Sequence, residues 1–372
     1  MNDAKPGGTY GLSAAGTRRV MPVPVVPYLP PRPHAYRPNV ALIGCGGISE
    51  YHLRAYDEMG LAVIALCDCE QARAEKRRLE FFPEARVYTD YRDVLLRDDI
   101  EVVDVALHPE ARVTVMEAAL RAQKHVLSQK PFVLDLAVGD RLVALADENR
   151  VKLAVNQNGR WAPHFSYLAA AVEAGVVGNV ASIDFTLQWD HTWTAGTAFE
   201  KIRHLVLFDF GIHWFDMAAR LMRGRTPERV WASVRRTDFQ QMWPPILGHV
   251  TIDYPDAQVR LNFNGHVREG QEDRTVICGS RGTLRSFGSS LSQQTVTVHT
   301  RAGQATVSLE GTWFTSGFQG AMGELLCAIE QDREPGNSGR NNRDSLALAF
   351  AALASADSGE PCQPGTVSRY AP

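Results

Sequence analysis

The sequence predicts an α/β protein in which a doubly wound parallel sheet is followed by an α+β domain with a large, mostly antiparallel open sheet. Two observations predict this fold class. From Asn39 to about Gln157, short apolar runs alternate with amphipathic stretches of helical length. After Gln157, β-type runs follow one another, with Gly, Asp, Pro and Ser between them. Parallel strands need covered helical crossovers, whereas short turns join antiparallel strands.

The sequence predicts that residues 1–38 form a proline-rich arm. The stretch MPVPVVPYLPPRPHAYRP favours extended backbone, because proline fixes φ and removes an N–H donor. Two interpretations stay open: a disordered leader, or an arm that lies on a neighbouring subunit and buries its valines, Tyr28 and Leu29 there. Arg18 and Arg19 match the arginine pair of a twin-arginine export signal. We reject that signal, because the prolines break the helical apolar core that it needs.

Residues 39–157 predict the first domain, with strands and helices in alternation. The predicted strands lie at 39–43, 61–67, 86–88, 101–106, 125–128 and 153–156. The predicted helices lie at 49–59, 71–82, 113–122 and 136–148. Strands separated by helices of this length pair in parallel, with helices on both faces of the sheet.

Residues 158–372 predict the second domain, which binds substrate and mediates oligomerisation. The predicted helices lie at 165–174, 208–222, 318–331 and 343–356. The predicted strands lie at 182–189, 228–236, 249–254, 258–265, 274–279, 282–287, 295–300 and 305–310. The last two helices are free to pack back on the first domain. An open sheet of this size would otherwise expose an apolar face, so we expect a homodimer or a homotetramer.

The first predicted strand runs into Gly44-Cys45-Gly46-Gly47-Ile48-Ser49, a G-x-G-x-x-S version of the dinucleotide-binding turn of Rossmann folds. Gly44 permits the tight turn. Gly46 lets the backbone approach a pyrophosphate at the helix N-terminus, where Gly47 and Ile48 also lie. These four residues are therefore the predicted cofactor-binding turn, with Ser49 in place of the usual Gly or Ala.

The second predicted strand ends at Asp68, about twenty residues after this turn. Its carboxylate is placed to accept hydrogen bonds from the 2′- and 3′-hydroxyls of a ribose. A phosphate at the 2′ position would be repelled by Asp68, and the neighbouring Cys69 supplies no positive charge. The sequence therefore favours NAD over NADP.

Four segments together resemble the Gfo/Idh/MocA oxidoreductases, the family of glucose-fructose oxidoreductase and the inositol dehydrogenases. They are Leu42-Ile43-Gly44-Cys45-Gly46-Gly47-Ile48-Ser49, Ser128-Gln129-Lys130-Pro131-Phe132, Gly159-Arg160-Trp161-Ala162-Pro163 and Asp209-Phe210-Gly211-Ile212-His213-Trp214-Phe215-Asp216. The resemblance runs from Asn39 to the C-terminal helices. It implies a hydride transfer between a nicotinamide and a sugar-like or cyclitol-like alcohol.

The resemblance also assigns site residues. The family's Glu-Lys-Pro motif is here Gln129-Lys130-Pro131, which keeps the lysine that lies beside nicotinamide and substrate in relatives. Gln129 and Lys130 are therefore expected at the cofactor, and Lys130 is expected to be catalytic. The lost carboxylate leaves the orientation of Lys130 open. The family's Thr-Pro-x-x-x-His stretch is altered to residues 107–112, so cofactor contacts there are expected to differ.

Asp209, His213 and Asp216 are spaced i, i+4 and i+7, which predicts that all three project from one face of a helix. By resemblance, His213 handles the hydroxyl proton and Asp209 orients it or binds a substrate hydroxyl. Imidazole titrates near neutral pH and suits this role. Lys130 is expected to stabilise negative charge on the alcohol oxygen. Asp216 has a structural alternative as a cap or an ion-pair partner.

Arg160, Trp161, His191 and Arg203 are the candidate substrate-binding residues. Aromatic faces stack on the C–H surfaces of sugars, while charged groups bind hydroxyls. Solvation of a loop is the alternative for His191 and Arg203, and an interface role is the alternative for Arg160.

Composition excludes several classes of partner. The net charge of −3 and the interspersed signs offer no basic stripe for nucleic acid. No run approaches the roughly 18 apolar residues of a membrane span. The six cysteines are scattered without zinc-ligand spacing, so we expect reduced thiols, no metal and a cytoplasmic protein. The expected partner is a small polyol or sugar.

The sequence thus predicts an NAD-dependent dehydrogenase that acts on CH–OH groups of a sugar, glycoside or cyclitol. Two alternatives remain. One is an enzyme that retains NAD and uses transient oxidation to cleave or epimerise a glycoside. The other is a non-catalytic NAD-binding regulator, which Gln129 and the altered stretch at residues 107–112 keep open.

Overall fold

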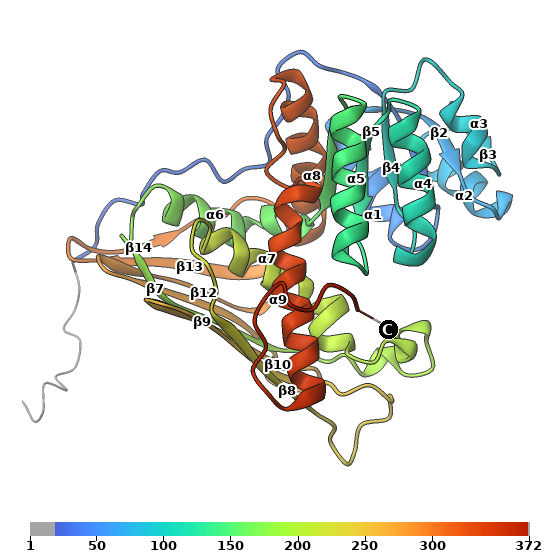
Figure 1. Cartoon of the computed structure of the whole chain (residues 1–372). Coiled ribbons are helices and arrows are strands. Elements are labelled where there is room, and N and C mark those ends of the chain that lie inside the picture. The colour runs from blue at the N-terminus through green and yellow to red at the C-terminus, as the bar shows by residue number, and fades with distance from the viewer. Residues whose placement is uncertain (1–18, 371–372) are drawn as a thin grey trace, which may run out of the picture.

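A computed structural model describes residues 19–370 and contains two β-sheets, each with its own helices (Figure 1). The smaller sheet is parallel and lies among α1 to α5. The larger sheet is open, with helices on one of its faces. This arrangement confirms the predicted fold class. No helix of residues 19–370 has both the length and the apolar character needed to cross a membrane.

The first sheet has six strands in the order β3-β2-β1-β4-β5-β6, all parallel. Its strands are β1 (Asn39–Ile43), β2 (Ala62–Cys67), β3 (Arg86–Tyr88), β4 (Val102–Val105), β5 (His125–Gln129) and β6 (Leu153–Asn156). Its helices are α1 (Ser49–Met59), α2 (Gln71–Phe81), α3 (Tyr91–Leu95), α4 (Pro109–Arg121) and α5 (Leu136–Glu148). Helix α4 begins earlier than predicted, because proline suits the first position of a helix.

The second sheet has eight strands in the order β14-β13-β12-β11-β7-β10-β9-β8. The strands are β7 (Val180–Gln188), β8 (Arg229–Arg235), β9 (Leu247–Tyr254), β10 (Ala257–Asn264), β11 (Glu272–Gly279), β12 (Gly282–Ser290), β13 (Gln293–Thr300) and β14 (Gly303–Val307). Strands β7 and β10 pair in parallel, and every other neighbouring pair is antiparallel.

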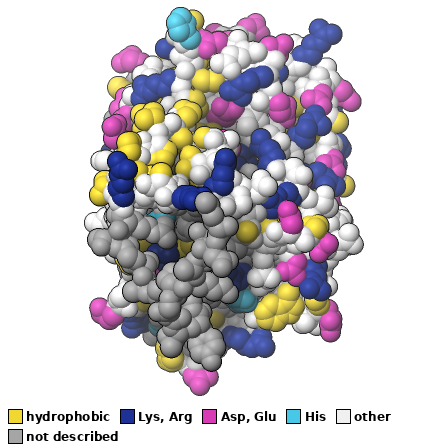
Figure 2. All heavy atoms as spheres, turned by 90° about the vertical axis from the view of Figure 1, so that its left-hand side faces the viewer, with side chains coloured by type: hydrophobic (Ala, Val, Ile, Leu, Met, Phe, Trp, Pro, Cys, Tyr) yellow, Lys and Arg dark blue, Asp and Glu magenta, His cyan; other side chains and the backbone are white. Residues whose placement is uncertain are grey.

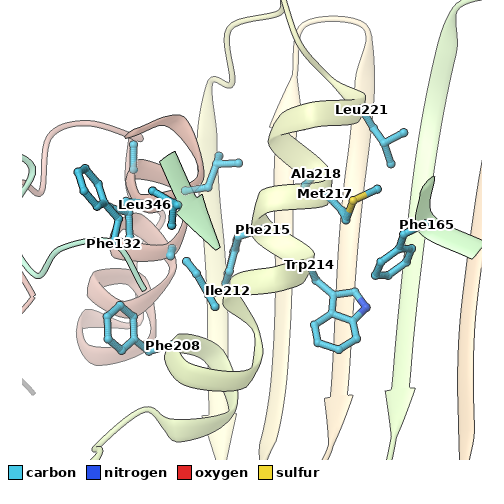
Figure 3. Packing of buried hydrophobic residues seen from close by; sticks show 14 of the residues in the cluster. Phe132, Phe165, Phe208, Ile212, Trp214, Phe215, Met217, Ala218, Leu221 and Leu346 are labelled. Carbon is cyan, nitrogen blue, oxygen red and sulfur yellow. The ribbon is translucent and has the colours of Figure 1, made fainter. Parts of the chain in front are cut away.

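Four longer helices complete the fold: α6 (Pro163–Glu173), α7 (Ile212–Leu221), α8 (Trp313–Glu330) and α9 (Gly339–Ser358). Helix α7 is apolar on two faces, because it lies between the large sheet and α9. Figure 3 shows Trp214 and Met217 pointing toward Phe165, while Phe215 points the opposite way, toward Leu346. This sandwich holds α7 firmly in place.

The C-terminal helices join the two sheets. Phe318, Met322 and Leu325 of α8 belong to one buried cluster with Leu53 and Tyr56 of α1. Helix α9 packs against both α5 and α7. A cleft between the parallel sheet and α7 therefore has walls that are fixed by common packing.

The outer face of the large sheet is mostly polar, which corrects the physical reason given for oligomerisation. Outward positions carry ion pairs such as Arg260–Asp184, at 2.6 Å, together with residues such as Thr251. Trp231 and Phe287 are isolated exceptions, 38% and 56% exposed. Such a face needs no partner to bury it. The oligomeric state stays a prediction.

The arm from Arg19 to Pro38 lies on its own chain. Tyr167 donates a hydrogen bond to the Pro24 carbonyl oxygen at 2.9 Å, and Ser166 donates to the Tyr28 carbonyl oxygen at 2.6 Å. At its start, Val20 bridges to Gln304 of β14. Figure 2 shows this side of the molecule, where described side chains of both charges are interspersed with hydrophobic ones. Any contact that residues 1–18 make with a neighbouring subunit lies outside the described residues.

Candidate active site

The glycine turn between β1 and α1 is open on its outer side. Gly44 has a φ of +101°, and an added Cβ would lie 2.6 Å from the carbonyl oxygen of Ala106. Gly44 is therefore required by both conformation and space. An added Cβ on Gly46 or Gly47 would meet no described atom within 4 Å. A ligand can therefore approach this backbone and the N-terminus of α1.

Asp68 lies directly beside this turn. One carboxylate oxygen accepts a hydrogen bond from the Cys45 N–H at 2.8 Å, and the other accepts one from the Glu70 N–H at 2.9 Å. These bonds fix the carboxylate, and each oxygen keeps a second lone pair for a ligand hydroxyl. The turn and Asp68 together fit an adenine dinucleotide, with Gly46, Gly47 and Ile48 toward its phosphates.

Sequence reasoning missed Arg77, a cation beside the same turn. Its guanidinium donates to the Ser49 hydroxyl at 3.1 Å and lies 3.4 Å from the Gly46 carbonyl oxygen. Glu50 and Glu80 form ion pairs with it, at 3.2 and 2.6 Å. Arg77 is one of two buried residues of α2, and this burial is a tertiary feature that no sequence pattern marked.

A cavity of about 590 Å³ lies between the carboxyl end of β5 and the start of α7. Parallel sheets of this kind bind ligands at the carboxyl ends of their strands. Its polar lining includes Gln129, Lys130, Asn158, Asp190, Asp209 and His213. Its aromatic lining includes Tyr51, Trp189, Trp193, Phe199, Phe210 and Phe314. No group of three or more metal-ligating side chains is found within residues 19–370.

Lys130 follows β5 and reaches across the cavity to a π-helical turn at Val206–Phe210. Its ammonium donates to the backbone carbonyl oxygen of Asp209 at 2.9 Å and lies 3.5 Å from the Asp209 carboxylate. Arg112, another residue that sequence reasoning missed, supports the backbone here. Its buried guanidinium donates to the carbonyl oxygens of Gln129, Lys130 and Pro131. Burial lowers the pKa of Arg112 to about 9.

Gln129 stands where the family has glutamate, and its amide belongs to a buried network. Its Oε1 accepts the Lys130 N–H at 2.7 Å, and its Nε2 lies 3.4 Å from His52 Nε2. His52 Nδ1 lies 2.6 Å from the Asp104 carboxylate, which also accepts the Tyr56 hydroxyl at 2.6 Å. The amide thus links the backbone of Lys130 to a buried histidine and carboxylate.

The predicted helix over 208–222 is wrong in its first turn. Val206–Phe210 forms a π-helical turn, and α7 begins only at Ile212. Gly211 connects the two, because an added Cβ there would lie 2.4 Å from the carbonyl oxygen of Leu207. The wider turn carries Asp209 to the wall of the cavity.

His213 also faces the cavity, next to Lys130. Its Nδ1 has no hydrogen-bond partner among the described residues. Enclosure within the protein, and then the charge of Lys130, lower the pKa of His213 well below its ordinary value. The imidazole is therefore neutral at pH 7 and able to accept a proton.

Asp216 does not share this face with Asp209 and His213. Its carboxylate forms a buried ion pair with Arg160, with N–O distances of 2.5 and 2.7 Å. Ser345 donates a further hydrogen bond to it at 2.8 Å. Asp216 is thus buried in an ion pair with Arg160, away from the cavity, which corrects the one-face prediction.

Of the four predicted substrate residues, the structure brings His191 alone to the cavity. Its imidazole stacks on the Phe210 ring at 4.3 Å, and burial lowers its pKa to about 4. Arg160 is held by Asp216. Arg203 pairs with Asp357 at 2.6 Å, and Trp161 packs under Gly320 of α8.

Comparison with known proteins identifies proteins that are similar to this chain. Models of an oxidoreductase family with an NAD-binding Rossmann fold and of the GFO/IDH/MocA C-terminal domain match residues 38–157 and 165–285. A D-apiose dehydrogenase of Paraburkholderia graminis is 26% identical over 357 residues, 89% of this chain and 91% of that protein.

Solved structures share the fold. An oxidoreductase from Agrobacterium radiobacter, in complex with NAD+, L-tartaric acid and magnesium, has a TM-score of 0.79 at 22% identity, over 89% of this chain and 99% of that one. The WlbA dehydrogenase from Bordetella pertussis, in complex with NADH and UDP-GlcNAcA, has a TM-score of 0.72 at 20% identity, over 88% and 99%.

Fold and site together define a two-domain oxidoreductase with a dinucleotide-binding Rossmann domain. The chain belongs to the Gfo/Idh/MocA family, as both matching models show.

Proposed function

We propose that this protein is an NAD-dependent dehydrogenase that oxidises a carbinol, or reduces the matching ketone, of a sugar, glycoside or cyclitol. One observation carries the proposal: Lys130, Asp209 and His213 converge on a cavity that adjoins the glycine turn. When bound, NAD supplies the acceptor for the hydride that leaves the carbinol carbon.

The protein's own residues handle the proton and the developing charge. His213 accepts the hydroxyl proton during oxidation and returns it during reduction, since its imidazole lines the cavity and its lowered pKa keeps it neutral. Lys130 donates a hydrogen bond to the substrate oxygen, because its ammonium has three protons and one is donated to the Asp209 carbonyl. The Asp209 carboxylate lies 3.5 Å from that ammonium and holds it at the cavity wall.

Asp68 supports the choice of NAD over NADP. Its carboxylate is fixed beside the glycine turn, where a 2′-phosphate would meet a like charge. Asp68→Ala should weaken NAD binding while leaving NADP binding nearly unchanged, as measured by calorimetry with both nucleotides. Equal losses for the two nucleotides would remove Asp68 from the ribose site.

The first experiment is mass spectrometry of the small molecules released on denaturation, followed by absorbance of NADH as polyols and glycosides are added. Released or bound NAD together with new NADH supports the dehydrogenase. Substrate consumption without NADH points to an enzyme that retains its cofactor. NAD binding without turnover of any polyol points to a regulator.

A further inference from the structure

We propose that the substrate is an uncharged glycoside with an apolar or aromatic aglycone. Its sugar carbinol lies at Lys130 and His213, and its aglycone lies against Trp193, Phe199 and Phe210. This inference rests on the proposed dehydrogenase function and names the substrate class of that site.

The charges around the cavity disfavour an anionic substrate. Among the described lining residues, Lys130 is the lone lysine or arginine, and it is already paired with Asp209 at 3.5 Å. Asp190 adds a second carboxylate. Phosphates and carboxylates are bound by unpaired Arg or Lys, often in a bidentate manner. A sugar phosphate, a uronic acid or a nucleotide sugar would find no such partner here.

Aromatic rings form a continuous surface beside the reactive groups. Phe210 directly follows Asp209, and its ring centroid lies 5.9 Å from Phe199 and 6.1 Å from Trp193. Trp193 and Phe199 are 5.3 Å apart, edge to face, and Trp193 is 55% exposed. Exposed aromatic faces of this kind gain most by stacking on flat apolar groups.

The segment that carries Trp193 and Phe199 is anchored to the large sheet. The Trp189 N–H donates to the Asn264 carbonyl oxygen at 2.9 Å, and the His191 N–H donates to the Gly265 carbonyl oxygen at 2.8 Å. His191 stacks under Phe210. The aromatic surface is therefore held in place before a ligand arrives, which lowers the entropic cost of binding.

The cavity has separate linings for the two parts of this ligand. Its volume of about 590 Å³ is shared with the cofactor, which is expected at Ile48, Gln129 and Lys130. Polar groups come from the end of β5, the π-helical turn and α7. Trp193 and Phe199 come from the segment after β7, and Phe210 comes from the π-helical turn. The lining thus offers hydroxyl partners for a sugar and an apolar wall for an aglycone.

The test compares phenyl β-D-glucopyranoside, methyl β-D-glucopyranoside and phenyl β-D-glucuronide, each with its α-anomer, by calorimetry on the NAD-loaded protein. We expect the phenyl glucoside to bind at least about tenfold more tightly than the methyl glucoside, which corresponds to about 1.4 kcal/mol. The glucuronide should bind more weakly than the phenyl glucoside. Equal binding of phenyl and methyl glucosides, or tightest binding of the glucuronide, would overturn the proposal.

Trp193→Ala should remove most of the preference for the phenyl glucoside, measured as the ratio of the two glucosides' dissociation constants in the same variant. Phe239→Ala is the matched control, since Phe239 is 71% exposed in the same domain and does not line the cavity. A preference that survives Trp193→Ala would contradict the aromatic wall.

Binding and turnover separate this inference from the proposed reaction. A Trp193-dependent preference without NADH formation from any glycoside would refute the proposed dehydrogenase activity and support the aglycone site. NADH formation from free polyols, without a preference for the phenyl glucoside, would support the dehydrogenase activity and refute the aglycone site.

Discussion

Two histidines on opposite sides of Lys130 show how partners decide the role of a side chain. His52 is completely buried, and both of its ring nitrogens have polar partners: Asp104 at Nδ1, with Gln129 and Asn156 at Nε2. His213 faces the cavity, and its Nδ1 has no described partner.

The difference separates a histidine that positions its neighbours from a histidine that can exchange a proton with a ligand. A fully bonded buried network orders the residues around it and has little freedom to exchange protons with a ligand. The His213 ring lines the cavity and is not tied into such a network, so it is available to a ligand hydroxyl. His52 therefore positions Gln129 and the backbone of Lys130, whereas His213 is the group proposed to take the substrate proton.

The largest expected effect is on catalysis at His213. His213→Ala should lower kcat/KM for oxidation by about 10² to 10⁴ while leaving NAD affinity and unfolding free energy nearly unchanged, because one acid–base group is lost. Steady-state kinetics and calorimetry measure both. His249→Ala, on the outer face of β9, is the control and should be silent. Full activity in the His213 variant would remove His213 from the mechanism.

The opposite pattern is expected for the network behind His52. Asp104→Ala removes the acceptor that His52 Nδ1 and the Tyr56 hydroxyl share, and leaves them only each other, 3.3 Å apart. That pair satisfies one of the two donors, and an unpaired buried group costs about 1 to 3 kcal/mol. The free energy of unfolding should therefore fall by about 1 to 3 kcal/mol, as measured in urea.

Asp140→Ala is the control for this variant, because it breaks an exposed ion pair with Arg343 and should cost less than about 1 kcal/mol. A stable Asp104 variant with lost turnover would reverse the roles assigned to the two histidines.

A difference of intermediate size is expected in the network's link to Lys130. In Gln129→Glu, a carboxylate replaces the amide that faces His52 Nε2, so the hydrogen bond that the amide N–H donates there is lost. We expect kcat/KM to fall about tenfold, equivalent to about 1.4 kcal/mol, as measured by steady-state kinetics. An unchanged kcat/KM would show that the network does not reach Lys130.

The smallest expected effect is the weak response of the wild-type protein to mild acid. A base must be neutral to accept a proton, and the pKa of His213 is lowered below its ordinary value of 6.5. Oxidation should therefore keep its kcat/KM as the pH falls from 7.5 to 6, with the decline at lower pH. An acid limb centred at or above 6.5 would show that another group, or a differently placed His213, controls the rate.

The sequence by itself determined the two sheets, the glycine turn with Asp68, and the choice of Lys130, Asp209 and His213 as candidates. These features rest on local patterns, namely the spacing of apolar residues and short motifs, which act over a few neighbouring residues. The open conformation of the turn around Gly44 follows from glycine alone, since other residues rarely adopt its φ of +101°.

Only the tertiary structure decided the rest. The π-helical turn before α7 and the ion pair of Asp216 with Arg160 depend on packing between the large sheet and α9, and i, i+4 spacing does not encode them. Gln129 meets His52 and Asp104 because three separate strands and helices bring them together. The polar outer face and the aromatic wall likewise arise when distant segments meet, so the chain order alone does not reveal them.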